Sequence, residues 1–225
     1  MKLKSFGCSF IEGDELSDFQ RRPVSEQSTW AGPTPISYLT YPALLAQHLG
    51  MQYECHAEGA SGNLRILRNV LKHIDHEPGL FVIQWTFIDR FDFINLAEWP
   101  ANSWNTFLPV DASDLAQTYY RNLHSEYRDK ISTLIYILTA IAALREHQHR
   151  FIMTYVDDLI LCNKWHTDPA IQFLQHSVRP YLKQFDKTNW IDWCKQNKFQ
   201  FGNFYHPLDA AHRATADYII QQDWV

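Results

Sequence analysis

The stretch LFVIQWT, residues 80–86, gives the first indication of the fold of this chain. It is apolar from Leu80 to Trp85 with one interruption, Gln84, and it ends at a polar threonine. An apolar run of this length is typical of a parallel β-strand buried on both faces, because helices cover both sides of such a sheet. The sequence therefore predicts a central strand here.

Similar strand-like runs and helical patterns lie on either side of this stretch. The strand-like runs are LKSFGCS (3–9), QYECHA (52–57) and RFIMTYV (150–156). Segments with apolar residues at three- and four-residue steps predict helices over 41–50, 64–74, 190–197 and 210–222, and one or two helices over 115–147. Strands that alternate with helices form right-handed βαβ units. We therefore expect an α/β fold, a three-layer α/β/α sandwich with a central parallel sheet of the flavodoxin-like type.

The composition narrows the classes of protein to which the chain can belong. It has 225 residues, 46% of them hydrophobic, so we expect one well-packed domain over residues 1–225. A net charge of −5 argues against binding to nucleic acid. The four cysteines are scattered, which is typical of reduced thiols. Because we find neither a signal peptide nor a membrane-spanning run, we expect a cytoplasmic location.

Polar loops follow three of the predicted strands, at the edge of the sheet where α/β proteins bind ligands. After the first strand, Gly7 and Cys8 precede Ser9, whose hydroxyl can lie on a tight turn beside a helix N-terminus. Ser9 can also simply cap that turn. After the second strand, in GASGN (59–63), Gly62 permits close backbone approach, and Asn63 can donate a hydrogen bond or cap a helix.

The third loop, QWTFIDRFDF (84–93), places Thr86, Asp89 and Arg90 after the central strand. These side chains can equally form an ordinary loop with one ion pair. Aromatic residues continue through this region at Trp85, Phe91, Phe93, Trp99 and Trp104. They either border a ligand cleft or form a small local core.

The order of these loops resembles the sequence blocks of the SGNH (GDSL-type) hydrolases. That family carries Gly-Asp-Ser after its first strand with serine as the nucleophile, and GCS (7–9) matches it with Cys8 in place of aspartate. Its second block ends in Ser-Gly, whose glycine N–H joins the oxyanion hole, and Gly62 matches that glycine. Its third block, Gly-x-Asn-Asp, has no counterpart in IQWTFID (83–89), so Thr86 and Asn63 are the nearest side-chain donors. Shortened bacteriophage variants are more similar, in GCSFIEG, SGNLRI and IQWT.

Two histidines compete for the family's last block, Asp-x-x-His. Asp209 and His212 fit the spacing, but the family's histidine precedes the last helix and is followed by proline, as His206 is. Pro207 suits the first turn of a helix, which leaves His206 in the preceding loop and free to approach Ser9. His212 would lie inside the helix. We therefore predict that His206 is the base.

The third member of the predicted triad is less well defined. Three residues before His206 stands Asn203, an amide that can orient the imidazole but cannot stabilise its positive charge. Asp209 is the alternative carboxylate. A third possibility is that catalysis has been lost and a binding function retained.

These residues predict a serine hydrolase that cleaves a small acyl ester, with O-acetyl groups on a carbohydrate as the preferred substrate class. Ser9 attacks, His206 transfers the proton and Asn203 orients His206. The expected oxyanion hole comprises Ser9, Gly62, Asn63 and Thr86, and the expected substrate contacts are Trp85 and Arg90. The chemistry requires no cofactor or metal.

Two alternatives remain open at this stage. The first is a catalytically weak or inactive binding or assembly protein with the hydrolase fold, which the missing acid and the missing asparagine favour. The second makes Cys8 the nucleophile, although successive residues that leave a strand point to opposite sides.

Overall fold

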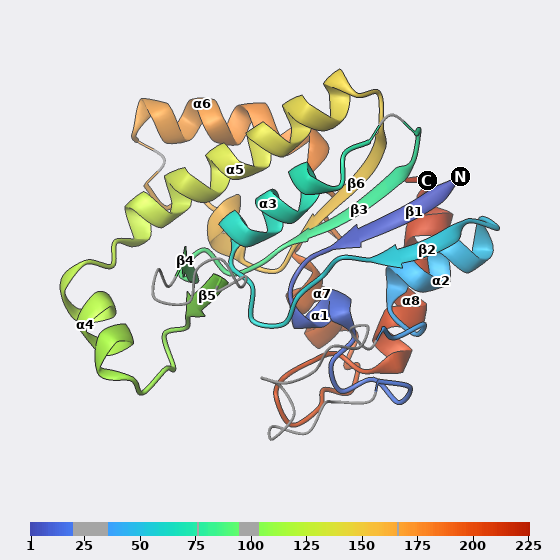
Figure 1. Ribbon diagram of the computed structural model, residues 1–225, viewed down its shortest axis with the longest axis horizontal. Helices are drawn as coiled ribbons and strands as arrows, with labels where there is room; N and C mark the ends of the chain where they lie inside the picture. The colour runs from blue at the N-terminus through green and yellow to red at the C-terminus, as the bar shows by residue number, and fades with distance from the viewer. Residues whose placement is uncertain (20–35, 76, 95–103, 166) are drawn as a thin grey trace.

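The computed structural model describes residues 1–19, 36–75, 77–94, 104–165 and 167–225. Its centre is a four-stranded parallel sheet with the order β2-β1-β3-β6. The strands are β1 (Lys2–Phe6), β2 (Gln52–Cys55), β3 (Leu80–Trp85) and β6 (Arg150–Tyr155). Because all four are parallel, their carboxyl ends meet at one edge of the sheet (Figure 1). The predicted α/β fold with a central parallel sheet is confirmed.

The central strand β3 is buried along its whole length, and its side chains alternate between two cores. Leu80 and Val82 pack on one face of the sheet. Phe81, Ile83 and Trp85 pack on the other. This two-residue alternation is that of an extended strand, and the apolar residues on both sides explain why the run has almost no polar interruption.

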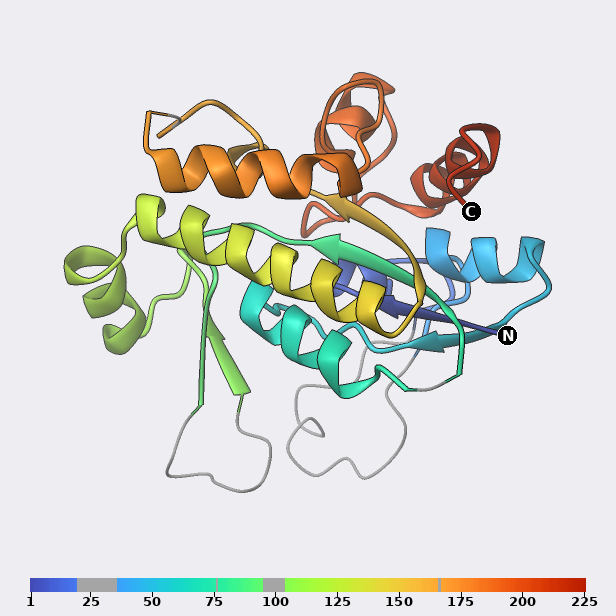
Figure 2. The same ribbon diagram turned by 90° about the horizontal axis from the view of Figure 1, so that it is seen from above.

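Helices cover both faces and make the outer layers. The first layer contains α3 (Asn63–Lys72), α5 (Glu126–Glu146) and α6 (Pro169–Val178); the second contains α1 (Ser9–Glu12), α2 (Tyr41–His48), α7 (Trp190–Gln196) and α8 (Asp209–Gln221). Helices α3 and α5 lie side by side across the first face (Figure 2). Short 3₁₀ turns, η3 (Asp158–Ile160) and η4 (Arg179–Tyr181), connect the later elements. Among the described helices, none has the length and apolar character needed to cross a membrane.

The sequence allowed one helix or two over the segment 115–147. The structure has two, α4 (Asp114–Asn122) and α5, because the Ser125 hydroxyl accepts a hydrogen bond from the Arg128 N–H and starts a new helix. Other features of the fold differ from the sequence prediction, and helix α6 is one of them. An antiparallel hairpin, β4 (Phe91–Ile94) and β5 (Trp104–Phe107), follows β3. Helix α8 begins at Asp209 and not at Pro207, although His206 still lies in the loop before it.

Candidate active site

Ser9 lies at the carboxyl end of β1, where the chain turns directly into the short helix α1. Cys8 is the N-cap of that helix and Ser9 is its first residue. The turn is tight, since a Cβ on Gly7 would lie 2.6 Å from the side chain of Ile11. The packing of Gly7 against Ile11 therefore fixes the direction in which α1 leaves the sheet, and Ser9 lines a cleft.

His206 approaches Ser9 from a turn near the opposite end of the chain. The turn is closed by the bridge between Phe201 and Pro207 and by a hydrogen bond from the Gly202 N–H to the His206 carbonyl. Nε2 of His206 lies 2.8 Å from Oγ of Ser9. The ring is buried, with Phe10 edge-on to it at a centroid distance of 5.1 Å. The hydroxyl and the imidazole are therefore within hydrogen-bonding distance.

Glu15 occupies the position that the sequence analysis assigned to Asn203. Its Oε2 lies 2.8 Å from Nδ1 of His206 and accepts a hydrogen bond from the Phe204 N–H at 3.0 Å. With Nδ1 donating to the carboxylate, Nε2 is left to accept the Ser9 proton. Glu15 itself has a left-handed backbone, with φ +69°.

Gly202 makes room for the carboxylate. A Cβ at this position would lie 2.6 Å from the carboxyl carbon and from both oxygens of Glu15. Burial raises the pKa of Glu15, but the hydrogen bonds from His206 and from backbone N–H groups outweigh it, and the net pKa is lowered. The group beside His206 is therefore an ionised carboxylate.

Neither Asn203 nor Asp209 orients the ring of His206. Asn203 is exposed, and it contributes its backbone N–H to Glu15. Asp209 accepts hydrogen bonds from the backbone N–H and the hydroxyl of Ser17, and so it holds the segment that carries Glu15. The prediction of Asn203 is corrected because a residue distant in sequence fills its place.

His212 is a structural residue, as its position inside the helix suggested. It is buried, and its Nδ1 accepts a hydrogen bond from the Tyr41 N–H at 3.1 Å. Burial lowers the pKa of His212 to about 3. A neutral ring that accepts a backbone hydrogen bond belongs to the core.

The predicted oxyanion donor Gly62 has another partner. Its N–H donates to Oδ1 of Asp92 at 2.8 Å, and the same carboxylate accepts the Arg65 N–H. Asp92 therefore caps the N-terminus of α3 in a buried position. The loop 59–63 does reach the cleft, but through Gly59 and Ala60.

Asn63 and Thr86 form a clamp between α3 and the end of β3. The Asn63 side chain accepts the Thr86 N–H at 2.8 Å and donates to the Thr86 carbonyl at 3.1 Å. It also donates to Thr133 on α5, and the Thr86 hydroxyl donates to Sγ of Cys8 at 3.5 Å. Both side chains are engaged in hydrogen bonds that hold the fold together. Their assignment to the oxyanion hole is therefore corrected.

Cys8 does not share the cleft with Ser9. It is buried in the core on the second face of the sheet, whereas Ser9 is partly exposed and faces His206. The geometry therefore supports a serine and not a cysteine as the nucleophile.

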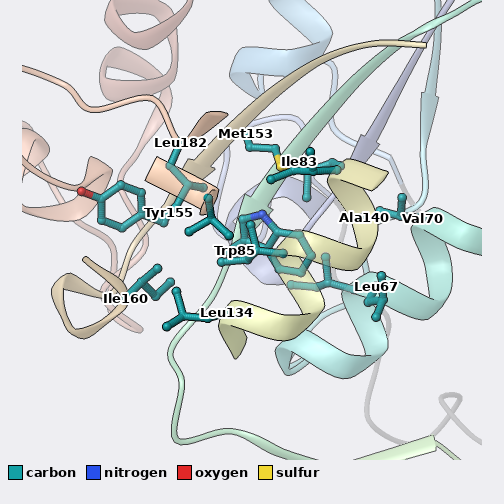
Figure 3. Packing of buried hydrophobic residues seen from close by; sticks show 14 of the residues in the cluster. Leu67, Val70, Ile83, Trp85, Leu134, Ala140, Met153, Tyr155, Ile160 and Leu182 are labelled. Atoms are coloured by element: carbon teal, nitrogen blue, oxygen red, sulfur yellow. The ribbon is translucent and has the colours of Figure 1, made fainter. Parts of the chain in front are cut away.

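Of the two substrate contacts predicted in the third loop, Trp85 and Arg90, the cleft contains only Arg90. Trp85 is fully buried among Leu67, Leu134 and Ala140 and cannot touch a ligand (Figure 3). Arg90 does line the cleft, where its guanidinium lies over the Phe87 ring and donates to the Ser61 carbonyl.

The other predicted aromatic residues lie away from the cleft. Phe91 and Phe93 pack with Phe107 in the hairpin, and Phe91 stacks on Tyr119 of α4. Trp104 lies under the guanidinium of Arg68. Trp99 is outside the described residues. These rings form the local core that was the alternative interpretation.

The cleft itself has a volume of about 1030 Å³ and is lined from several elements. Its aromatic residues are Phe10, Phe19, Phe87, Phe201, Phe204 and Tyr205; its charged residues are Glu12, Asp14, Asp157, Asp158, Asp192, Arg90 and Lys195. No three His, Cys, Asp or Glu side chains in the described ranges converge in a manner suited to a metal ion.

Glu15 was not predicted because the family's last block, Asp-x-x-His, places the acid next to the histidine. Glu15 precedes His206 by 191 positions, but it follows Ser9 closely in GCSFIEGDE (7–15). The available signal was an acidic pair placed directly after Gly13, whose φ of +94° turns the chain. The turn brings this pair back toward the serine.

No family model and no curated protein matches the sequence. Solved structures are similar over the whole of this chain, at low identity. One is a carbohydrate esterase described as having divergent catalytic and non-catalytic binding functions, with a TM-score of 0.54, 12% identity and 70% of its chain covered. Another is the acetyl xylan esterase Est2A from the rumen bacterium Butyrivibrio proteoclasticus, with a TM-score of 0.50, 13% identity and 65% of its chain covered.

The protein TesA is also similar, with a TM-score of 0.50, 12% identity and both chains covered completely. Two of these three neighbours are described as esterases. At such identities the likeness concerns the arrangement of the backbone alone. This chain therefore shares the α/β fold of these proteins.

Proposed function

We propose that this chain is a serine esterase of the SGNH type that acts on small acyl esters. The observation that carries the proposal is the alignment of three side chains, with Ser9 and Glu15 each 2.8 Å from a different nitrogen of His206. A hydroxyl, an imidazole and a carboxylate in this order form a complete nucleophile, base and orienting acid.

The mechanism follows from the hydrogen bonds. Oγ of Ser9 attacks the ester carbonyl carbon while its proton moves to Nε2 of His206. Glu15 stabilises the imidazolium that forms. His206 then gives the proton to the leaving alcohol oxygen as the carbon–oxygen bond breaks. Water, deprotonated by His206, releases the acid from the acyl-serine, and the proton returns to Ser9.

The oxyanion hole differs from the one that the sequence suggested. The backbone N–H of Ser9, in the first turn of α1, is the donor that we assign to the oxyanion. Loss of one oxyanion donor costs about 10²- to 10³-fold in turnover in other hydrolases. We therefore expect slow turnover.

We place the chain with the shortened bacteriophage-like variants of the family. The support is the clamp between Asn63 and Thr86. It joins SGN (61–63) to WT (85–86), two of the motifs that carry the resemblance. The polar residues of the two motifs therefore hold the start of α3 against the end of β3.

We assign an O-acetylated carbohydrate as the substrate class. The neighbours described as carbohydrate or acetyl xylan esterases are consistent with it, and a cleft of about 1030 Å³ can hold more than an acetyl group. The acidic lining disfavours anionic esters, because like charges repel.

A serine-reactive fluorophosphonate tests the nucleophile. We expect one adduct on Ser9 at neutral pH, none in Ser9→Ala and an undiminished adduct in Cys8→Ser. Hydrolysis of ethyl acetate, followed by proton release, should show the same pattern. A folded protein that neither labels nor hydrolyses the ester would refute the esterase.

A second candidate is a catalytically weak or non-catalytic binding protein with the same fold. The hydrogen bond between the Gly62 N–H and Asp92 favours it, because it withdraws an expected oxyanion donor. This candidate predicts that Ser9→Ala binds an acetylated glycoside as tightly as the parent chain does, while the parent chain hydrolyses no ester.

A further inference from the structure

Two aromatic side chains next to His206 are unusually exposed. Phe204 is 60% exposed and Tyr205 is 80% exposed, and both line the cleft. Aromatic rings normally contribute their large apolar area to a core or an interface. Their exposure at the rim of a cleft therefore suggests a surface that a ligand covers.

Backbone hydrogen bonds hold the turn that carries both rings. Tyr205 has a left-handed conformation, with φ +62°, which is uncommon for a residue with a large side chain. Its N–H donates to the Gly202 carbonyl at 3.2 Å, and the Phe204 N–H donates to Glu15. The turn that presents the rings is thus the turn that anchors the orienting acid.

The chemistry of the site assigns these rings to the alcohol side of the ester. In the proposed function, on which this inference rests, His206 delivers a proton to the leaving alcohol oxygen. Groups next to His206 in the turn therefore lie near the alcohol and not near the acyl group. We propose that Phe204 and Tyr205 form a stacking platform for the sugar ring of the alcohol.

The same cleft supplies polar groups for the hydroxyls of such a ring. Asp158 follows β6 and is exposed, and Asp192 and Lys195, which form an ion pair, come from the first and the last turn of α7. Carboxylates accept hydrogen bonds from hydroxyls and ammonium groups donate to them. A pyranoside, with apolar C–H faces and hydroxyls at its edge, matches a cleft that contains both exposed aromatic rings and polar side chains.

Other substrate classes fit this cleft less well. A long acyl chain requires an enclosed apolar channel, whereas these rings stand at an exposed rim. A nucleotide or sugar phosphate would meet five acidic side chains and only two basic ones. An uncharged sugar meets neither obstacle.

Binding measurements in a Ser9→Ala background test the platform without turnover. Calorimetric titration with a mono-O-acetylated methyl glucoside should give a measurable Kd, weakened at least tenfold by either Phe204→Ala or Tyr205→Ala. Tyr205→Trp should restore the affinity, because a larger ring can stack equally well. Phe173→Ala, which removes a 66% exposed ring from α6, is the matched control and should leave Kd unchanged.

Steady-state kinetics of the otherwise unaltered chain separates this inference from the proposed function. The ratio of kcat/KM for the acetylated glucoside to that for ethyl acetate should fall at least tenfold in Tyr205→Ala, mainly through KM. An unchanged Kd and an unchanged ratio would overturn the platform while leaving the esterase intact. Tight binding by Ser9→Ala without ester hydrolysis by the parent chain would instead overturn the esterase and leave the platform standing.

Discussion

Glu15 completes the proposed triad. It gives the order Ser9, Glu15, His206 along the chain, with an acid that comes from the loop after α1 and not from the histidine turn. A triad is defined by the geometry of its groups and not by their order in sequence. The proposed nucleophile and base could be predicted from sequence because each follows a recognisable local pattern, whereas the position of the acid depends on how two distant loops pack.

Gly202→Ala tests whether space for the carboxylate is limiting. The new Cβ would lie 2.6 Å from Glu15, so the carboxylate must move away from His206. We expect kcat for ethyl acetate to fall about 10²-fold or more, with a change in Tm of less than about 2 °C because the turn is a surface feature. Combining it with Glu15→Gln should cause little further loss. If the losses in kcat of the two single variants add up in the double variant, Gly202 does not act through Glu15.

At the scale of elements, the loop before α3 helps to hold the fold together. The sequence had suggested that it contributes to the oxyanion hole. Asp92 comes from the hairpin β4–β5, which the sequence analysis did not predict. Without that hairpin, the N–H of Gly62 would be free to bind an anion. The error in the oxyanion hole therefore follows directly from a missed element, and the same holds for the aromatic residues that pack within the hairpin.

Asp92→Ala should destabilise the protein through the start of α3. It leaves the N–H groups of Gly62 and Arg65 and the hydroxyl of Thr106 without their acceptor. Loss of a helix cap costs about 0.5–2 kcal/mol, and each kcal/mol corresponds to about 2–4 °C in Tm for a chain of this size. Thermal unfolding followed by circular dichroism should show a decrease of several degrees. Asp217→Ala, on the exposed side of α8, is the control and should leave Tm unchanged.

On the scale of the whole molecule, the parallel sheet could be predicted because short strand-like runs alternate with helical patterns along the sequence. The helices at 41–48, 63–72, 190–196 and 209–221 appear close to their predicted bounds. Helix α6 was not predicted, although Asp168 at its N-cap and Pro169 at its first position are ordinary start signals. What the sequence could not supply was the packing of the loops at the carboxyl edge.

Buried histidines should make the fold sensitive to acid. Burial lowers the pKa of His212 to about 3, and burial together with His73 lowers the pKa of His56 to about 4. An unfolded histidine titrates near 6.5. Between these values the unfolded chain binds more protons than the folded one, so stability is complete above about pH 6.5 and decreases as the pH falls.

For His212 alone this linkage amounts to about 2 kcal/mol of lost stability at pH 5. The measurement is Tm between pH 7.5 and pH 5 for the parent chain and His212→Gln, whose amide can accept the Tyr41 N–H without titrating. We expect a smaller decrease in Tm for His212→Gln. His48→Gln, at an exposed position, should follow the parent curve. Parallel curves for all three proteins would contradict the linkage.

A comparison of three variants tests whether Glu15 is the acid partner of His206. The measurement is kcat/KM for ethyl acetate in Glu15→Gln, Asn203→Ala and Asp209→Asn, with folding verified by circular dichroism. We predict a loss of about 10²- to 10⁴-fold for Glu15→Gln, and less than about tenfold for Asn203→Ala and Asp209→Asn. Glu15→Gln with nearly full activity, or Asn203→Ala with a loss as large as that predicted for Glu15→Gln, would contradict the account.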